Sequence, residues 1–127
     1  MEKKEGYYML IGTVTSIGPQ AISQKDPIII LFGEGATEDI REVSVIQEFE
    51  NAEQADLKVG QTILFDEEAY TIEAVGVLAT DNLNSIGHIT LSFSEVPAED
   101  MLGNGIYLTP HRLPDFKLGM KISYQND

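Results

Sequence analysis

The chain has 127 residues, with 21 acidic and 8 basic side chains, a formal net charge of −13 and no cysteine. This length predicts a single domain over residues 1–127 with an ordinary hydrophobic core. The lack of cysteine excludes disulfides and thiolate chemistry, and the negative charge disfavours binding to nucleic acid or to an anionic membrane. The acidity either keeps a small protein soluble or steers it toward a basic partner.

Short strands separated by turns dominate the predicted secondary structure. Gly18-Pro19 ends the first strand, and Asp66-Glu67-Glu68 predicts the turn of a hairpin. Thr37 is a suitable N-cap for one short helical turn, and Asp81 is expected to cap a second turn that ends at Gly87. The predicted strands are 7–17, 28–32, 42–48, 62–65, 70–78, 88–93, 106–108 and 121–124.

Two of these strands carry specific predictions about burial. The continuous apolar run over 28–32 predicts a strand that is buried on both faces. The segment 88–93 alternates instead, so Ile89, Leu91 and Phe93 are expected to face the core. The polar residues between them, Thr90 and Ser92, are expected to be more exposed.

An internal echo links residues 56–65 to residues 115–124, which share Asp, Lys, Gly and Ile at a constant offset. Gly60 and Gly119 are expected to adopt positive φ in the turns that lead into these two strands. Either any small barrel begins its strands in this way, or the chain contains a duplicated half with the two copies related by a pseudo-dyad. The predicted fold is all-β: a small closed or nearly closed β-barrel of about eight short strands with one or two short helical turns.

The N-terminal apolar run from Tyr7 to Leu10 is too short for a membrane span or a signal peptide, because Gly12 and Thr13 soon interrupt it. The sequence therefore favours a cytoplasmic protein that is not itself embedded in a membrane. Gly33-Glu34-Gly35 lacks the lysine and the hydroxyl of a phosphate-binding loop. The acidic triplet at 66–68 is typical of a solvated turn, so no metal site and no cofactor are predicted.

Two imidazoles, those of His88 and His111, are the candidate nucleophiles of the chain. A neutral imidazole nitrogen can accept and pass on a phosphoryl group. His88 begins a strand beside Thr90, whose hydroxyl could fix the ring tautomer or contact a phosphoryl oxygen; the alternative is a structural, hydrogen-bonding histidine. His111 lies in a proline-flanked loop, where Arg112 is a possible anion partner.

Two segments carry a resemblance to a known family: Glu34-Gly35-Ala36-Thr37-Glu38-Asp39-Ile40-Arg41-Glu42-Val43-Ser44-Val45-Ile46 and Asp81-Asn82-Leu83-Asn84-Ser85-Ile86-Gly87-His88-Ile89-Thr90-Leu91-Ser92-Phe93. The chain resembles the IIA component of the glucitol/sorbitol phosphotransferase system from about Gly12 to Phe93, and more weakly beyond. The resemblance implies a phosphotransferase system component, bacterial in origin. Its partners would be the histidine phosphocarrier protein, which supplies phosphate, and a IIB/IIC membrane sugar-transport component, which receives it during uptake of a sugar alcohol.

The resemblance places the phospho-accepting histidine directly after Ile46, and this chain has Gln47 there. A carboxamide nitrogen has no available lone pair to attack phosphorus. Gln47 is either an ordinary polar residue at a strand end, or a binding residue at the former active-site position close to His88. Three hypotheses follow: a phosphate relay that uses a substitute histidine, a catalytically silent regulatory or binding paralogue, and an unrelated ligand-binding β-barrel.

Overall fold

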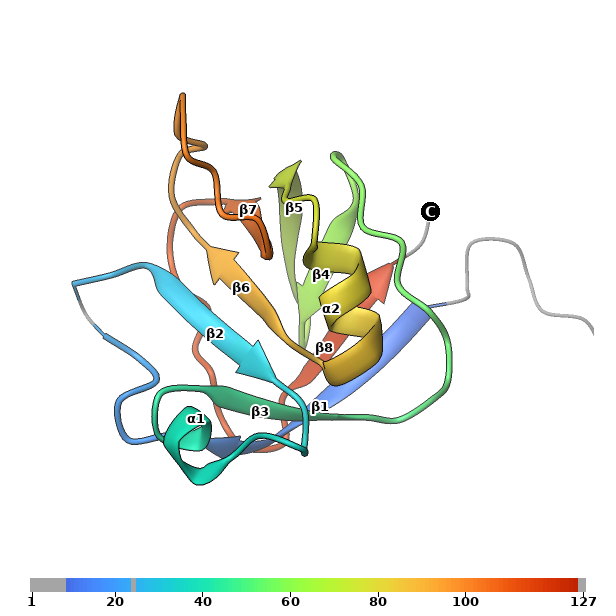
Figure 1. Cartoon of the computed structure of the whole chain (residues 1–127). Helices are drawn as coiled ribbons and strands as arrows, with labels where there is room; N and C mark the ends of the chain where they lie inside the picture. The colour runs from blue at the N-terminus through green and yellow to red at the C-terminus, as the bar shows by residue number, and fades with distance from the viewer. Residues whose placement is uncertain (1–8, 24, 126–127) are drawn as a thin grey trace, which may run out of the picture.

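Eight β-strands close into a barrel in the computed structural model, which describes residues 9–23 and 25–125 (Figure 1). Their hydrogen-bonded order around the barrel is β1-β3-β2-β6-β7-β5-β4-β8. This confirms the predicted all-β barrel. The strands are β1 (Met9–Ile17), β2 (Ile28–Phe32), β3 (Val45–Phe49), β4 (Thr62–Phe65), β5 (Glu68–Val75), β6 (Ile89–Ser92), β7 (Gly105–Thr109) and β8 (Lys121–Gln125).

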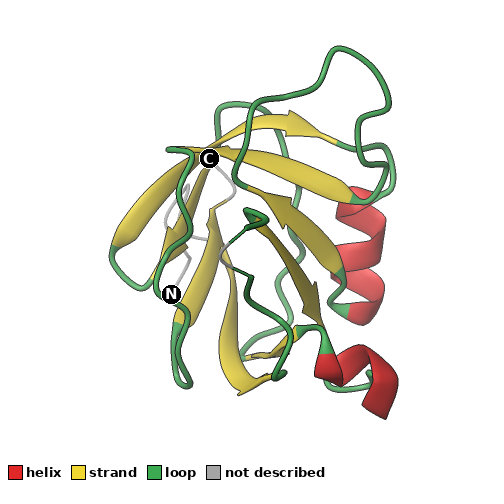
Figure 2. Ribbon diagram, turned by 90° about the vertical axis from the view of Figure 1, so that its left-hand side faces the viewer, coloured by secondary structure: helices red, strands yellow, loops and turns green. Residues whose placement is uncertain are grey.

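Two short helices, α1 (Glu38–Glu42) and α2 (Ala79–Ile86), lie on the same side of the barrel (Figure 2). The Thr37 hydroxyl accepts a hydrogen bond from the Ile40 amide at 3.4 Å, which confirms the predicted N-cap. The prediction that Asp81 caps the second helix is wrong, because α2 already begins after Leu78 and Asp81 lies in its first turn. There its charge faces the positive end of the helix dipole.

Several strand limits differ from the predicted ones. The third strand begins at Val45 because α1 continues through Glu42 and Val43 caps its C-terminus. The fifth strand ends at Val75, since the following residues lead into α2. The hairpin between β4 and β5 is confirmed, with Phe65 paired to Glu68 across its turn. The first two residues of the predicted strand 7–17 lie outside the described residues.

The barrel core confirms the apolar half of the prediction for β6 and corrects the polar half. Ile89, Leu91 and Phe93 are buried, but Thr90 and Ser92 are also buried, with 9 % and 2 % of their surface exposed. The connection from β6 to β7 accounts for this, because it folds back over the outer face of the sheet. The Leu102 amide donates to the Tyr107 hydroxyl at 3.0 Å, the Thr90 amide donates to the Asn104 carbonyl at 3.1 Å, and Ser92 pairs with Tyr107.

Strand β2 is buried on one face only, so the prediction of burial on both faces is wrong. Ile29 and Leu31 belong to the core, whereas Ile28 is 40 % exposed and Ile30 is half-buried. The reason is that a barrel strand has an inner and an outer face, and the apolar run by itself does not show that the outer face stays in contact with solvent.

Strand pairing reveals two halves, β1–β4 and β5–β8, that are related by an approximate two-fold axis. Strands β4 and β8 pair as Ile63 with Tyr124 and as Phe65 with Ile122. Adding 59 to a residue number in β4 gives the equivalent residue in β8, so Ile63 is equivalent to Ile122 and Phe65 to Tyr124. The two residue pairs are therefore equivalent to each other. Strands β2 and β6 behave in the same way with an offset of 60, as Ile29 pairs with Leu91 and Leu31 pairs with Ile89. The echo in the sequence is therefore one part of a repeat that runs through the whole barrel.

Turn geometry follows the same repeat. The Gly60 amide donates to the Ile72 carbonyl and the Gly119 amide donates to the Val14 carbonyl, both at 2.8 Å. Gly60 has a φ of +94° and Gly119 a φ of +87°, which confirms the positive φ predicted for both. The ladders of β1 with β3 and of β5 with β7 also shift register at matching places, after Val14 and after Ile72. Val14 and Ile72 are thus equivalent positions.

Candidate functional site

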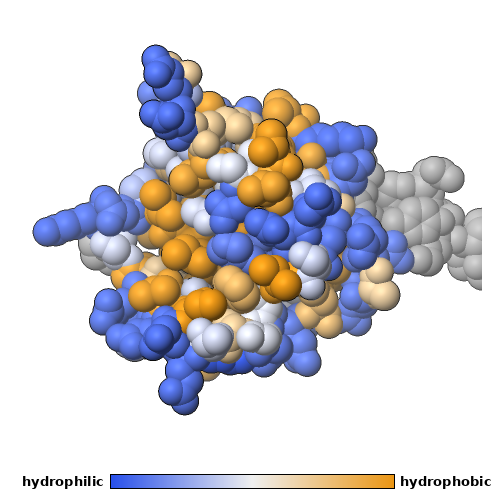
Figure 3. Space-filling view, viewed as in Figure 1, coloured by the Kyte–Doolittle hydropathy of each residue, from blue (hydrophilic) through white to orange (hydrophobic). Residues whose placement is uncertain are grey.

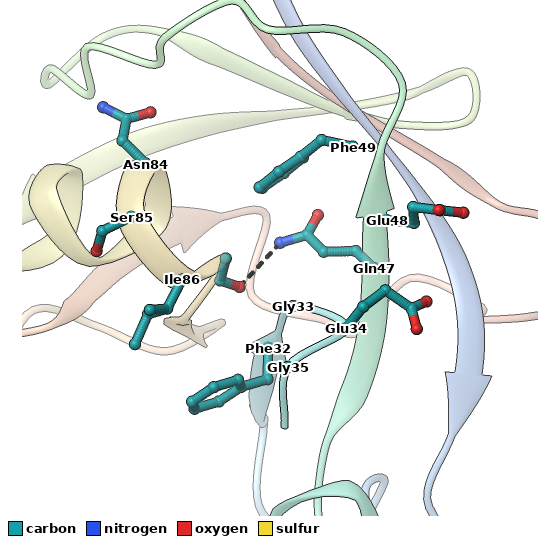
Figure 4. A pocket seen from close by; sticks show the side chains of 11 residues that line it. Phe32, Gly33, Glu34, Gly35, Gln47, Glu48, Phe49, Asn84, Ser85 and Ile86 are labelled. Carbon is teal, nitrogen blue, oxygen red and sulfur yellow. Dashed lines mark hydrogen bonds between the residues drawn. The ribbon is translucent and has the colours of Figure 1, made fainter. Parts of the chain in front are cut away.

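A pocket of about 460 Å³ lies between strand β3, the C-terminal end of α2 and the segment that follows β2 (Figure 4). Its apolar side chains are Phe32, Phe49 and Ile86, and three glycines contribute backbone to its wall. The residues that line it are Phe32, Gly33, Glu34, Gly35, Gln47, Glu48, Phe49, Asn84, Ser85, Ile86 and Gly87. Both segments that carry the family resemblance therefore meet in this pocket.

Gln47 projects from β3 toward the end of α2, with 1 % of its surface exposed. Its Nε2 donates to the Gly87 carbonyl at 3.3 Å, and its Oε1 accepts a hydrogen bond from the Tyr124 hydroxyl at 2.8 Å. Complete burial raises the pKa of Tyr124 well above its usual value, so this hydroxyl keeps its proton and acts as the donor. The structure thus confirms that Gln47 lies beside the residue that precedes His88.

Space for the Gln47 side chain comes from Gly12 on the neighbouring strand. A Cβ at Gly12 would overlap the Oε1 atom of Gln47. Sequence reasoning missed both Gly12 and Tyr124 as members of this site. One signal was available for Tyr124: it is the tyrosine of the repeated segment, at the position where the first copy has Phe65.

Acidic side chains stand at the rim of the pocket. The Glu34 carboxylate accepts from the Thr15 hydroxyl at 2.6 Å and pairs with the Arg41 guanidinium at 3.5 Å. The hydrogen bond from Thr15, assisted by Arg41, lowers the pKa of Glu34. The carboxylates of Glu34 and Glu48 both point away from Gln47 (Figure 4). None of the eleven residues that line the pocket is basic.

His88 lies beside this pocket but is not one of the residues that line it. Its Nδ1 contacts the Leu31 carbonyl at 3.1 Å, and because a carbonyl only accepts, Nδ1 carries the proton. Nε2 of the neutral ring then accepts from the Asn104 amide at 2.8 Å. The ring stacks on Phe32 at a centroid distance of 4.6 Å. Leu31 and Asn104 thus fix the ring tautomer, which is one of the two roles suggested above for the Thr90 hydroxyl.

The other predicted site residues lie apart from the pocket lining. Thr90 pairs with Ile30 on one side and Gly105 on the other, within the sheet. His111 is exposed, and its Nε2 contacts the Glu73 carboxylate at 3.1 Å. Arg112, the anion partner suggested for His111, contacts the Glu68 carboxylate at 3.5 Å. The structure therefore does not bring the two histidines into the pocket lining with Gln47.

Comparison with known proteins agrees with this architecture. Residues 9–123 match the family described as the glucitol/sorbitol-specific IIA component of the phosphotransferase system. The chain belongs to this family. A crystal structure of a phosphotransferase system IIA component from Enterococcus faecalis V583 superposes on this chain with a TM-score of 0.88 and 42 % identity. That match covers 91 % of this chain and 99 % of the other.

Two glucitol/sorbitol-specific EIIA components also align with this IIA family member, over 82 residues each. The protein from Escherichia coli (strain K12) is 38 % identical and that from Shigella flexneri is 37 % identical. Each alignment covers 64 % of this chain and 66 % of the relative, so the chain spans about two thirds of the relatives it matches. Within residues 9–23 and 25–125, no helix is long and apolar enough to cross a membrane.

Proposed function

We propose that the protein is the IIA component of a phosphoenolpyruvate-dependent phosphotransferase system for a sugar alcohol such as glucitol. In this role it works in the cytoplasm, between the histidine phosphocarrier protein and a IIB partner. The observation that carries the proposal is the family match over residues 9–123, together with a pocket formed by the two segments of the resemblance. The phosphate relay is the part of the proposal that needs a nucleophile.

His88 is the candidate nucleophile, because the carboxamide nitrogen of Gln47 has no available lone pair with which to attack phosphorus. The proton on Nδ1 leaves the His88 Nε2 atom with the lone pair that attacks phosphorus, and the bond between phosphorus and the histidine nitrogen of the phosphocarrier breaks as the new bond forms. In this structure the Asn104 amide occupies that lone pair, so Asn104 must turn away before His88 can react. Thr90, two residues further along β6, is retained in this proposal as a binding residue.

A second candidate function is a catalytically silent member of the family that binds phosphotransferase partners and regulates. The geometry of Gln47 favours it, since both polar atoms of the carboxamide already have protein partners. On either proposal the partner faces an acidic surface with exposed apolar residues next to the pocket. Ile86 is 51 % exposed at the pocket, and Leu78 is 53 % exposed at the other end of α2. Figure 3 shows apolar residues on both sides of a hydrophilic area on this face.

Phosphoryl transfer in vitro tests the relay. The purified protein is incubated with phosphoenolpyruvate, the general phosphotransferase enzyme and the histidine phosphocarrier, and labelling is compared among wild type, His88→Ala, His111→Ala and Gln47→His. We expect at most weak labelling of wild type. The relay predicts that this label is acid-labile and is lost in His88→Ala but not in His111→Ala, whereas the silent member predicts no label.

Gln47→His should create or raise labelling, since Gly12 leaves room for a side chain at this position. Wild type that stays unlabelled while Gln47→His is labelled would favour the silent member over the relay. Strong labelling of wild type that survives the loss of both histidines would defeat both versions.

A further inference from the structure

Asn104, whose amide contacts His88, is also the one asparagine of the sequence that precedes a glycine, Gly105. The other asparagines precede residues that carry a side chain. A glycine has no Cβ beside its own backbone nitrogen, so this nitrogen can approach the side chain of the preceding residue. An Asn-Gly pair is therefore the arrangement in which a backbone nitrogen attacks the carboxamide carbon most readily.

Packing of the barrel requires glycine at position 105. A Cβ there would lie 3.0 Å from the Leu102 Cβ and 3.1 Å from the Thr90 carbonyl oxygen. The Gly105 nitrogen itself is held weakly, because its hydrogen bond to the Leu102 carbonyl is long, at 3.4 Å. The fold thus places a glycine after Asn104 and leaves its nitrogen with a weak hydrogen bond.

His88 holds the Asn104 side chain, whose amide nitrogen lies 2.8 Å from the His88 Nε2 atom. Asn104 is half-buried, and its backbone carbonyl accepts from the Thr90 amide at 3.1 Å, so the side chain can turn while the backbone stays paired. Turning away from Nε2 is the movement that a reactive His88 requires. It also releases the carboxamide carbon for attack by the Gly105 nitrogen.

We propose that Asn104 is a site of spontaneous deamidation and that its contact with His88 slows this reaction. The Gly105 nitrogen attacks the Asn104 side-chain carbon, and the bond from this carbon to the amide nitrogen breaks. That nitrogen leaves as ammonia, with the proton of the Gly105 amide. Water then opens the cyclic imide at either carbonyl, which gives aspartate or isoaspartate.

A carboxylate at position 104 reverses the hydrogen bond to His88. The carboxamide donates to Nε2, whereas a carboxylate only accepts, so it favours a ring that carries a proton on Nε2 as well as on Nδ1. The other groups that contact the ring, the Leu31 carbonyl and the Phe32 ring, are uncharged. A doubly protonated ring has no lone pair for phosphorus. This consequence rests on the proposed relay, but the modification does not.

Incubation of the full-length protein at mildly alkaline pH, with and without urea, tests the proposal. Peptide mass spectrometry follows the replacement of NH2 by OH at each asparagine, and enzymatic methyl transfer detects isoaspartate. We expect product at Asn104 in the folded protein. Asn84 should stay unmodified there, because serine follows it and both polar atoms of its carboxamide bond the Ala55 backbone.

His88→Ala removes the partner of Asn104 and should speed deamidation about two- to tenfold, the factor that corresponds to one hydrogen bond. His111→Ala is the matched control, since His111 contacts Glu73, and its rate should equal that of wild type. Asn104→Gln keeps the amide but should form no product, because the longer side chain closes the imide ring far more slowly.

Asn104→Asp imitates the product and tests the contact even if His88→Ala does not fold. Its His88 ring nitrogens, observed by NMR, should both carry protons at a pH at which wild type carries one.

Three results would overturn the proposal: no product at Asn104 in folded wild type while the protein in urea reacts, equal rates for folded His88→Ala and wild type, or identical His88 ring shifts in Asn104→Asp and wild type. The labelling experiment is read separately. Deamidation without phosphoryl transfer leaves the modification site and removes the relay, whereas phosphoryl transfer without deamidation removes the modification site alone.

Discussion

Two corners of the barrel that are related by the pseudo-dyad contain different chemistry. We call them the Gln47 corner, formed by Gly12, Gln47 and Tyr124, and the Leu108 corner, formed by Tyr70, Leu108 and Phe65. The strand pairing shows which residues are equivalent. Gly12 pairs with Ile122 as Tyr70 pairs with Ile63, so Gly12 is equivalent to Tyr70. Val14 pairs with Gln47 as Ile72 pairs with Leu108, so Gln47 is equivalent to Leu108.

At the Leu108 corner the space is filled by apolar groups and rings. Phe65 and Tyr70 pack edge to face at a centroid distance of 5.2 Å, and Leu108 is fully buried. The Tyr70 hydroxyl reaches the Arg112 carbonyl at 2.9 Å. At the Gln47 corner a glycine replaces the tyrosine, and a buried hydrogen bond replaces the ring contact. The same backbone thus builds a packed core in one half and a polar site beside a pocket in the other.

Truncation of core leucines is expected to lower the free energy of unfolding most, and by equal amounts in the two halves. Leu31 and Leu91 are dyad-related, and both are fully buried. Leu31→Ala and Leu91→Ala should each lower the free energy of unfolding by about 2–5 kcal/mol. Urea denaturation measures both. An unchanged midpoint for either variant would show that the repeat does not extend to core energetics.

Substitution of glycines that lie close to other backbone segments is expected to cause the second largest loss of stability. A Cβ at Gly18 would overlap the carbonyls of Arg41 and Glu42, and one at Gly76 would overlap those of Leu102 and Gly103. Because backbone cannot move aside as a flexible side chain can, Gly18→Ala and Gly76→Ala should each cost about 1–3 kcal/mol. Gly35→Ala is the control, as nothing lies within 4 Å of its Cβ position. Equal melting temperatures for Gly76→Ala and Gly35→Ala would contradict the expected overlap.

Removing a hydroxyl at the Gln47 corner and adding one at the Leu108 corner tests how the two corners differ. Tyr124→Phe removes the donor to the buried Gln47 oxygen and should cost about 1–3 kcal/mol. Phe65→Tyr adds a hydroxyl at the packed corner, where a buried unpaired hydroxyl also costs roughly 1–3 kcal/mol. Thermal unfolding of the two variants checks both values. A Tyr124→Phe protein as stable as wild type would mean that the polar corner does not depend on this bond.

The same tyrosine predicts an alkaline pH dependence. The pKa of Tyr124 is raised in the folded state by burial, so above about pH 10 the unfolded chain loses this proton before the folded chain does. The stability is therefore fully present below about pH 10 and falls as pH rises above it. Tyr124→Phe should show a shallower loss than wild type, with Tyr70 contributing in both proteins because burial raises its pKa as well. Parallel curves would contradict this expectation.

Substitution of exposed turn residues should change the free energy of unfolding least, and by equal amounts in the two halves. Val59 and Leu118 are dyad-related, and each is 67 % exposed. Val59→Ser and Leu118→Ser should change the free energy of unfolding by less than about 0.5 kcal/mol. A loss of more than about 1 kcal/mol in one of them alone, measured by urea denaturation, would reveal an unequal role for the two turns.

Local pattern determined much of this fold. The burial of Ile89, Leu91 and Phe93, the cap at Thr37, the hairpin at 66–68 and the positive φ of the glycines at 60 and 119 were predicted correctly, because each depends on a few neighbouring residues. The family resemblance also indicated position 47 as the place where the phospho-accepting residue is expected. What the sequence could not show was how burial is completed by distant segments.

Tertiary structure alone decided which faces are covered and what Gln47 touches. Thr90 and Ser92 are buried because the connection to β7 folds over them, whereas on the outer face of β2 Ile28 stays 40 % exposed. The partners of Gln47 are Tyr124 and Gly87, which lie 77 and 40 residues away in the chain. Closing the barrel brings these groups together, and such long-range contacts leave no periodic signal in the sequence from which they could be predicted.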